Sequence, residues 1–179
     1  PARMDLFTYM EEEIYQLCLK NSKENPFNHY LDFLKELKEL TDDERRLSQG
    51  PGWEFLHIVE TTSMSKSYKM PILLAFYNDG EIKMGITEED VYQSCKAFYE
   101  KDQNWRDMEK DKNTRDFRSW DKKRYVSEAR KNPVHFLKES GSGFFVEREG
   151  FVLALRDDLK DVVTEPAFVQ HMKDIIDYR

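Results

Sequence analysis

The order of the apolar segments after residue 50 constrains the fold of this chain more than any other feature. Three helix-like segments come first, at residues 71–77, about 88–100 and about 120–131. Two short β runs follow, at 144–147 and 151–155. Helical spacing of apolar residues predicts helices, and short runs bounded by turn residues predict strands. Three helices followed by a β-hairpin therefore predict a small α+β domain.

The first two helices have recognisable boundary signals. The run at 71–77 is almost wholly apolar and could be a buried helix or a buried strand. Leu73-Leu74-Ala75 favours the helix, with Pro71 in its first turn. Asn78-Asp79-Gly80 follows directly and is a turn signal. Thr87 is expected to cap the next helix, because three acidic residues come after it in the positively polarised first turn.

The later segments have similar boundary signals. Ser119 is expected to cap the third helix, which should stop at Asn132 because a proline follows. Arg148-Glu149-Gly150 separates the two β runs and is a hairpin signature, and Thr164-Glu165-Pro166 opens a last amphipathic helix. This element order is that of a winged helix-turn-helix. We predict a mostly helical α+β fold, with a winged-helix-like core and a C-terminal β-hairpin over residues 51–179.

Residues 1–50 predict a helical N-terminal extension. Apolar residues recur at helical spacing from Leu6 to Cys18 and again from Phe27 to Leu40. Gly50-Pro51-Gly52 then breaks the pattern, and we place a domain boundary there. The apolar run at 53–60 that follows is of uncertain type. Residues 1–3, which precede a methionine, look like an added remnant rather than a native start.

The composition is that of a folded chain with a small core. Apolar residues make up 39% and charged residues 35% of the chain, yet 13% are aromatic, and disordered chains are poor in aromatic residues. No apolar stretch is long enough for a transmembrane helix, so we expect no membrane partner. Cys18 and Cys95 are too few for a disulfide framework, and they indicate a reducing, cytoplasmic location.

The sequence offers no recognisable catalytic, nucleotide-binding or metal site. Neither a phosphate-binding loop nor a dinucleotide fingerprint occurs among its seven glycines. The four histidines are scattered. Glu81-Ile82-Lys83 beside Asp79 lacks the second, upstream carboxylate that a nuclease metal site needs. We expect this chain to be non-enzymatic and to hold no cofactor of its own.

One segment is basic in an otherwise acidic chain. The formal net charge is -7, but residues 101–131 hold 11 basic and 7 acidic side chains. Aromatic residues are interleaved with these cations; cations neutralise phosphates, and aromatic faces stack on unpaired bases. The acidic residues favour the alternative, a solvated or partner-facing surface. The DNA contacts predicted in this segment are Arg115, Arg118, Trp120, Lys122, Lys123 and Arg124.

Two further places carry predicted DNA contacts. Lys66 and Lys69 lie in a Ser-Lys-Ser-Tyr-Lys run just before a helix, where they could hold a phosphate at the helix N-terminus. In the alternative, Ser65 or Ser67 caps the helix, Tyr68 packs in the core and the lysines are solvated. Arg148 lies at the tip of the predicted hairpin, where a wing contacts backbone phosphate or the minor groove, although acidic residues flank it.

Five segments also carry a family resemblance through their order and spacing. They are Thr61–Phe76, Ala97–Tyr99, Asp107–Lys112, Asn132–Leu137 and Gly143–Phe145. Together they resemble the C-terminal region of bacterial DEAD/DEAH-type (superfamily 2) helicase-like proteins of restriction or phage-defence loci, some of which have a phospholipase-D-type nuclease domain. The resemblance covers roughly residues 53–179.

The resemblance implies that this chain is a C-terminal piece of a larger protein, whose helicase motor lies upstream and uses ATP and Mg²⁺. It supplies no catalytic residue for the present sequence. We therefore expect an accessory module that binds or positions DNA for the motor. The alternative is a coupling domain between the motor and a partner or nuclease subunit, which docks through the acidic residues Asp42, Asp43 and Glu44.

Overall fold

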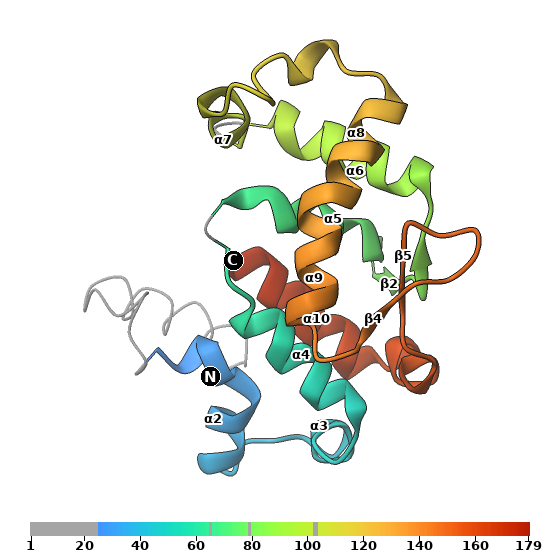
Figure 1. Cartoon of the computed structure of the whole chain (residues 1–179). Coiled ribbons are helices and arrows are strands. Elements are labelled where there is room, and N and C mark those ends of the chain that lie inside the picture. Colours follow the sequence, from blue (N-terminus) through green and yellow to red (C-terminus); the bar gives the residue numbers. More distant parts are fainter. Residues whose placement is uncertain (1–24, 65, 79, 102–103) are drawn as a thin grey trace. The chain divides into compact units, whose positions relative to one another are not determined.

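The computed structural model describes residues 25–64, 66–78, 80–101 and 104–179 (Figure 1). These residues belong to two compact units. The first unit ends at Leu40, and the second runs from Thr41 to Arg179. In the first unit, the 3-10 turn η1 (Pro26–His29) leads into helix α2 (Tyr30–Glu36), within the second predicted N-terminal stretch. The first predicted stretch, from Leu6 to Cys18, lies outside the described residues.

The division between the units lies between Leu40 and Thr41. The sequence had predicted the domain boundary later, at the break at residues 50–52. Helix α3 (Asp42–Leu47) opens with a capping box, in which Glu44 Oε2 accepts from the Thr41 N–H at 2.9 Å and Thr41 Oγ1 accepts from the Glu44 N–H at 3.3 Å. Glu44 Oε1 also lies 2.5 Å from His171 Nε2 of helix α10 (Pro166–Tyr178), and both side chains are buried. Residues 41–50 therefore belong to the second unit.

An aromatic core joins α10 to helices α4 (Pro51–Thr61) and α5 (Met70–Phe76). The run at 53–60 is thus helical. The Phe55 ring centroid lies 5.8 Å from that of Phe144 and 5.6 Å from that of Phe145. Phe168 of α10 stacks on Phe55 at 5.9 Å. Rings at these separations add to the stability gained from burial alone.

Helices α5 and α6 (Glu88–Glu100) lie where the sequence predicted them. Pro71 is in the first turn of α5. At the start of α6, Thr87 Oγ1 accepts from the Asp90 N–H at 3.2 Å, and Asp90 Oδ2 accepts from the Thr87 N–H at 2.8 Å. This capping box confirms Thr87 as the N-cap.

The third predicted helix starts later than expected. Helix α8 (Lys122–Ala129) is capped by Asp121, whose carboxylate accepts from the Arg124 N–H at 2.8 Å. Ser119 belongs instead to the 3-10 turn η3 (Phe117–Ser119), and its hydroxyl donates to the carbonyl of Asp116. The prediction was wrong because an acidic residue two positions later satisfies the first turn of the helix.

The same helix also continues past its predicted end at Asn132. A π-helical turn, η4 (Arg130–Val134), carries the chain through Pro133 into helix α9 (His135–Ser140). Figure 1 shows α8 and α9 as one orange column. Pro133 has no N–H to donate, and the wider π turn accommodates the missing hydrogen bond. The proline is therefore an interruption within a longer helix rather than its end.

The strands of the described part form two small antiparallel sheets. β1 (Tyr77–Asn78) pairs with β2 (Glu81–Ile82) at the predicted turn. β4 (Phe145–Val146) and β5 (Leu153–Leu155) form the predicted hairpin, and β3 (Gly85–Ile86) pairs with the other edge of β5. The strand order is β3-β5-β4. The fold is thus mostly helical, with a small three-stranded antiparallel sheet.

Short turns complete the second unit. They are the 3-10 turns η2 (Ser67–Lys69), η5 (Asp157–Leu159) and η6 (Val162–Thr164). Gly150, in the hairpin loop, has a φ of 83°, which favours glycine. Among the residues that the structure describes, every helix is too short or too polar to cross a bilayer.

Candidate nucleic-acid interface

Residues 104–121, here called the connector, join α6 to α8 and carry much of the basic segment. The connector contains helix α7 (Arg106–Lys110) and η3. Its Met108 and Phe117 side chains are buried. The Tyr125 hydroxyl of α8 donates to the carbonyl of Phe117 at 3.1 Å, and the Thr114 hydroxyl donates to that of Met108 at 2.6 Å. These contacts fix the path of the connector beside α8.

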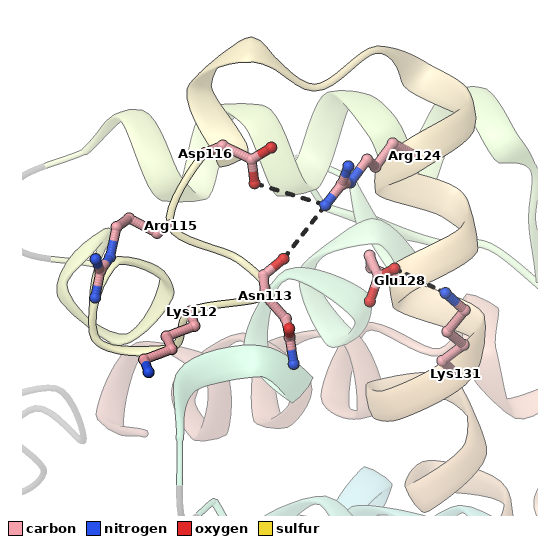
Figure 2. A pocket seen from close by; sticks show the side chains of 7 residues that line it. All are labelled: Lys112, Asn113, Arg115, Asp116, Arg124, Glu128 and Lys131. Atoms are coloured by element: carbon pink, nitrogen blue, oxygen red, sulfur yellow. Dashed lines mark hydrogen bonds and ion pairs between the residues drawn. The ribbon is translucent and has the colours of Figure 1, made fainter.

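The connector and α8 border an open depression, here called the basic hollow. Figure 2 shows the side chains around it. Four of them are cations and two are carboxylates, so the lining is net positive in a chain that is net negative. The lining residues are Lys112, Asn113, Arg115, Asp116, Arg124, Glu128 and Lys131.

Two of the four cations in the basic hollow are paired with its two carboxylates. Arg124 Nη2 lies 3.6 Å from Asp116 Oδ1 and donates to the backbone carbonyl of Asn113 at 3.4 Å (Figure 2). Lys131 Nζ donates to Glu128 Oε1 at 2.8 Å. A hydrogen bond from Trp120 and the charge of Arg124 hold the pKa of Asp116 below its usual range. This acid therefore stays charged.

The other two cations, Lys112 and Arg115, have no carboxylate partner among the described residues. Arg115 Nε donates only to the backbone carbonyl of Glu109, at 3.4 Å. Both side chains are exposed. A phosphate in the basic hollow would therefore meet two cations that no acid of the described chain neutralises.

The remaining predicted cations of the segment lie outside the basic hollow. Lys122 donates to Glu89 of α6 at 3.0 Å, and Arg118 pairs with Glu109 while its guanidinium lies 4.7 Å from the centre of the Phe117 ring. Lys123 is exposed. Exposed ion pairs of this kind contribute little to stability.

Trp120, predicted as a surface stacking residue, is only 7% exposed. Its Nε1 donates to Asp116 Oδ1 at 2.9 Å, its ring packs edge-on against Tyr125 at 5.3 Å, and the Arg124 guanidinium lies 4.9 Å from its centre. Trp120 instead forms part of the wall of a cavity of about 220 Å³, together with three tyrosines. We call this space, between the connector, α6 and α8, the aromatic cavity. Its aromatic residues are Tyr68, Tyr99, Trp120 and Tyr125.

The predicted anion site before α5 is occupied by a carboxylate of the chain itself. The N–H and hydroxyl of Ser67 donate to Asp107 Oδ2 of α7 at 3.0 and 3.1 Å. These bonds, the backbone one foremost, lower the pKa of Asp107. Lys66 lies 3.6 Å from Asp111 and 5.3 Å from the centre of the Tyr68 ring. Ser67 thus binds an acid rather than capping the helix, and Tyr68 is only part-buried. Ser65, the other predicted cap, lies outside the described residues.

Lys69 and Arg148 are not brought to the basic hollow. Lys69 Nζ donates to the hydroxyls of Thr62 and Ser140, at 2.9 and 3.3 Å, and burial and then the charge of Arg179 lower its pKa. Arg148 lies in a separate groove between α9 and the hairpin, where it pairs with Asp157. Both side chains therefore have polar partners within the second unit.

Three residues that line the basic hollow were not predicted from the sequence as DNA contacts: Lys112, Asn113 and Lys131. One signal was available, because Arg124, Glu128 and Lys131 recur at i, i+4 and i+7 and so share one helix face. Lys112 and Asn113 carried no such signal, since their positions depend on the irregular path of the connector.

No group of His, Cys, Asp or Glu side chains in the described ranges is arranged to hold a metal ion. Comparison of the chain with family models, curated proteins and solved structures returned no match. The resemblance to helicase-like proteins therefore stays a prediction.

Proposed function

We propose that this chain is a non-catalytic accessory module that binds DNA through the basic hollow and positions it for a helicase-like motor. The observation that carries the proposal is the pair Lys112 and Arg115, two exposed cations without a carboxylate partner in the described chain. They lie at the centre of the one basic segment of an acidic chain. A local basic patch can attract a polyanion even when the net charge of the chain is negative.

The paired cations support the same proposal. Arg124 and Lys131 are held by Asp116 and Glu128 in exposed ion pairs. Such pairs contribute about 0–1 kcal/mol each, so a phosphate can replace a carboxylate at small cost. Binding would then release counterions from the nucleic acid, which makes the affinity fall as salt rises.

The arrangement of elements supports a winged-helix-like core. The strand β3 lies between α5 and α6, and it pairs with β5, the last strand of the hairpin. In a winged helix, the corresponding strand also pairs with the last strand of the wing. The column α8–α9 then takes the place of the recognition helix, whose N-terminal residues face DNA. The connector is much longer than the usual 3–4-residue turn before that helix, and it brings Lys112 and Arg115 beside α8.

Fluorescence anisotropy with labelled single- and double-stranded DNA, at two salt concentrations, tests the proposal. We expect binding that weakens steeply with salt. The double variant Lys112→Ala/Arg115→Ala should bind more weakly and show a shallower salt dependence, by about one unit of slope per lost phosphate contact. The matched control Lys160→Ala/Lys173→Ala removes the same charge from elsewhere in the second unit and should bind as the unmodified chain does.

Two results would overturn the proposal. One is the absence of binding to either DNA form at low salt, which would favour the coupling-domain alternative. The other is an equal loss of affinity in the two double variants, which would mean that total charge rather than the basic hollow governs binding.

A further inference from the structure

The connector also borders the aromatic cavity. Phosphate binding in the basic hollow does not explain this cavity. Its walls combine Tyr99 of α6, Tyr125 and Ala129 of α8, and Trp120 of the connector. Its volume of about 220 Å³ is below the range of about 300–1,000 Å³ that is typical of pockets for drug-sized ligands. The cavity therefore suits a single flat ring system with aromatic neighbours.

The hydroxyl of Tyr99 is an unused hydrogen-bonding group in this wall. Tyr99 is 5% exposed, and its hydroxyl makes no hydrogen bond to any described residue. The neighbouring hydroxyls of Tyr68 and Tyr125 each donate to a backbone carbonyl at 3.1 Å. Burial raises the pKa of Tyr99, so its hydroxyl keeps its proton and can donate. Buried polar groups normally have a partner, which in this cavity would be a ligand atom.

No fully enclosed side-chain nitrogen or oxygen of the described residues lacks a partner. The Tyr99 oxygen is therefore not fully enclosed, and Tyr99 lines the aromatic cavity. A bound group with an acceptor atom would satisfy this hydroxyl.

The cavity shares a rim with the basic hollow. Asn113, Glu128 and Lys131 line both spaces. The side-chain amides of Asn113 and of Asn132, which also lines the cavity, make no hydrogen bond to the described residues. Amides of this kind pair with the polar edge of a base. A ring in the cavity would thus lie next to polar edge groups and close to the cations of the hollow.

We propose that the aromatic cavity receives one unpaired nucleobase, joined to a phosphate that lies in the basic hollow. This inference rests on the proposed function, since the phosphate contacts are those of the hollow. A base in the cavity would stack on aromatic walls and accept from the Tyr99 hydroxyl. Duplex DNA offers no unpaired base, so the site would favour single strands, ends or extruded bases.

The test uses an eight-nucleotide abasic strand and the same strand carrying a single 2-aminopurine, a fluorescent base. We expect the single base to tighten binding by between about 5-fold and 150-fold, the range for stacking of one base, and its fluorescence to change on binding. Free 2-aminopurine nucleoside monophosphate serves as a competitor. If the mononucleotide competes with the same affinity as the strand, a free nucleotide is the source of the base. If it competes more weakly, the base comes from a strand.

Two variants locate the effect. Ala129→Leu fills the cavity from α8 and should abolish the gain from the single base while leaving duplex binding unchanged. Tyr99→Phe keeps the ring, removes only the hydroxyl, and should lose part of the gain. Circular dichroism melts establish whether each variant folds. If Ala129→Leu does not fold, Tyr99→Phe still tests the cavity.

The outcomes separate this inference from the proposed function. If duplex DNA binds but the two short strands bind equally and 2-aminopurine fluorescence is unchanged, the cavity does not receive a base, while the basic hollow remains a DNA contact. If neither duplex, strand nor mononucleotide binds at low salt, both proposals are wrong.

Discussion

Asp107 joins the connector to the start of α5, and its removal tests whether this joint stabilises the second unit. Its Oδ2 accepts from the N–H and the hydroxyl of Ser67 at 3.0 and 3.1 Å. Its backbone carbonyl accepts from the Tyr68 hydroxyl at 3.1 Å. Asp107→Ala removes the two side-chain bonds together with an exposed ion pair to Lys110 Nζ at 3.6 Å, which contributes little, and it keeps the backbone bond. The variant therefore isolates the contribution of the carboxylate.

The expected cost follows from these two bonds. A hydrogen bond to a charged group contributes about 1.5–3 kcal/mol, and the 28% exposure of the Asp107 side chain lowers that value. We expect the free energy of unfolding to fall by about 2 kcal/mol in total. With a urea dependence of about 2 kcal/mol per molar, the unfolding midpoint would fall by about 1 M. The control Asp111→Ala loses an exposed pair with Lys66 and an exposed bond from the Asn113 N–H at 3.1 Å, and it should cost about 0.5–1 kcal/mol.

The pH dependence has a definite sign. The bonds from Ser67 lower the pKa of Asp107 in the folded state. Its carboxylate therefore stabilises the fold fully above the unfolded pKa of about 3.9, and this contribution is lost as pH falls through the lower folded value. The stability gap between the unmodified chain and Asp107→Asn should shrink below about pH 4. An equal loss of stability in Asp107→Ala and in the control Asp111→Ala, measured by urea unfolding at pH 7, would refute this reasoning.

Two further predictions concern the elements that position the site. Thr87→Ala removes one half of the capping box of α6 and should lower the free energy of unfolding by about 1 kcal/mol in urea titrations, whereas Thr164→Ala, with an exposed side chain, should change it by less than about 0.5 kcal/mol. Phe55→Ala opens the centre of the aromatic core and should cost about 3–5 kcal/mol, with a lower melting temperature in calorimetry. The control is Phe136→Ala, at a residue that is 47% exposed. An equal loss of unfolding free energy in both variants would mean that Phe55 is not at the centre of the core.

Much of the fold could be predicted wherever one local signal decides an element. Thr87 and the acidic residues after it define the start of α6, and Arg148-Glu149-Gly150 defines the hairpin. The strand β3 could not be predicted, because two residues are too few to show an alternation and its pairing with β5 is long-range. The passage of the helix through Pro133 also escaped prediction, since propensity alone favours a stop there.

The candidate site was harder to predict than the fold. The charge of the basic segment identified the region, but not which of its cations lack a carboxylate partner. That distinction depends on pairs such as Lys122 with Glu89 and Arg130 with Glu88, which join α8 and η4 to α6 across long stretches of sequence. The burial of Trp120 was equally invisible, because it results from the tertiary packing of the connector against Tyr125.

The pairing of cations also determines how strongly salt should affect DNA binding. Log affinity falls with log salt by about 0.7 per neutralised phosphate on a single strand. If Lys112 and Arg115 alone bind phosphates, the slope is about -1.4, and if Arg124 and Lys131 also exchange their carboxylates it is about -2.8. Contacts by all 11 cations of the basic segment would give about -7.7. A measured slope between about -1.4 and about -2.8 supports DNA binding by the basic hollow. A slope near -7.7 would mean that the internal ion pairs do not restrain the cations of the basic segment, and that the basic hollow is not the binding site.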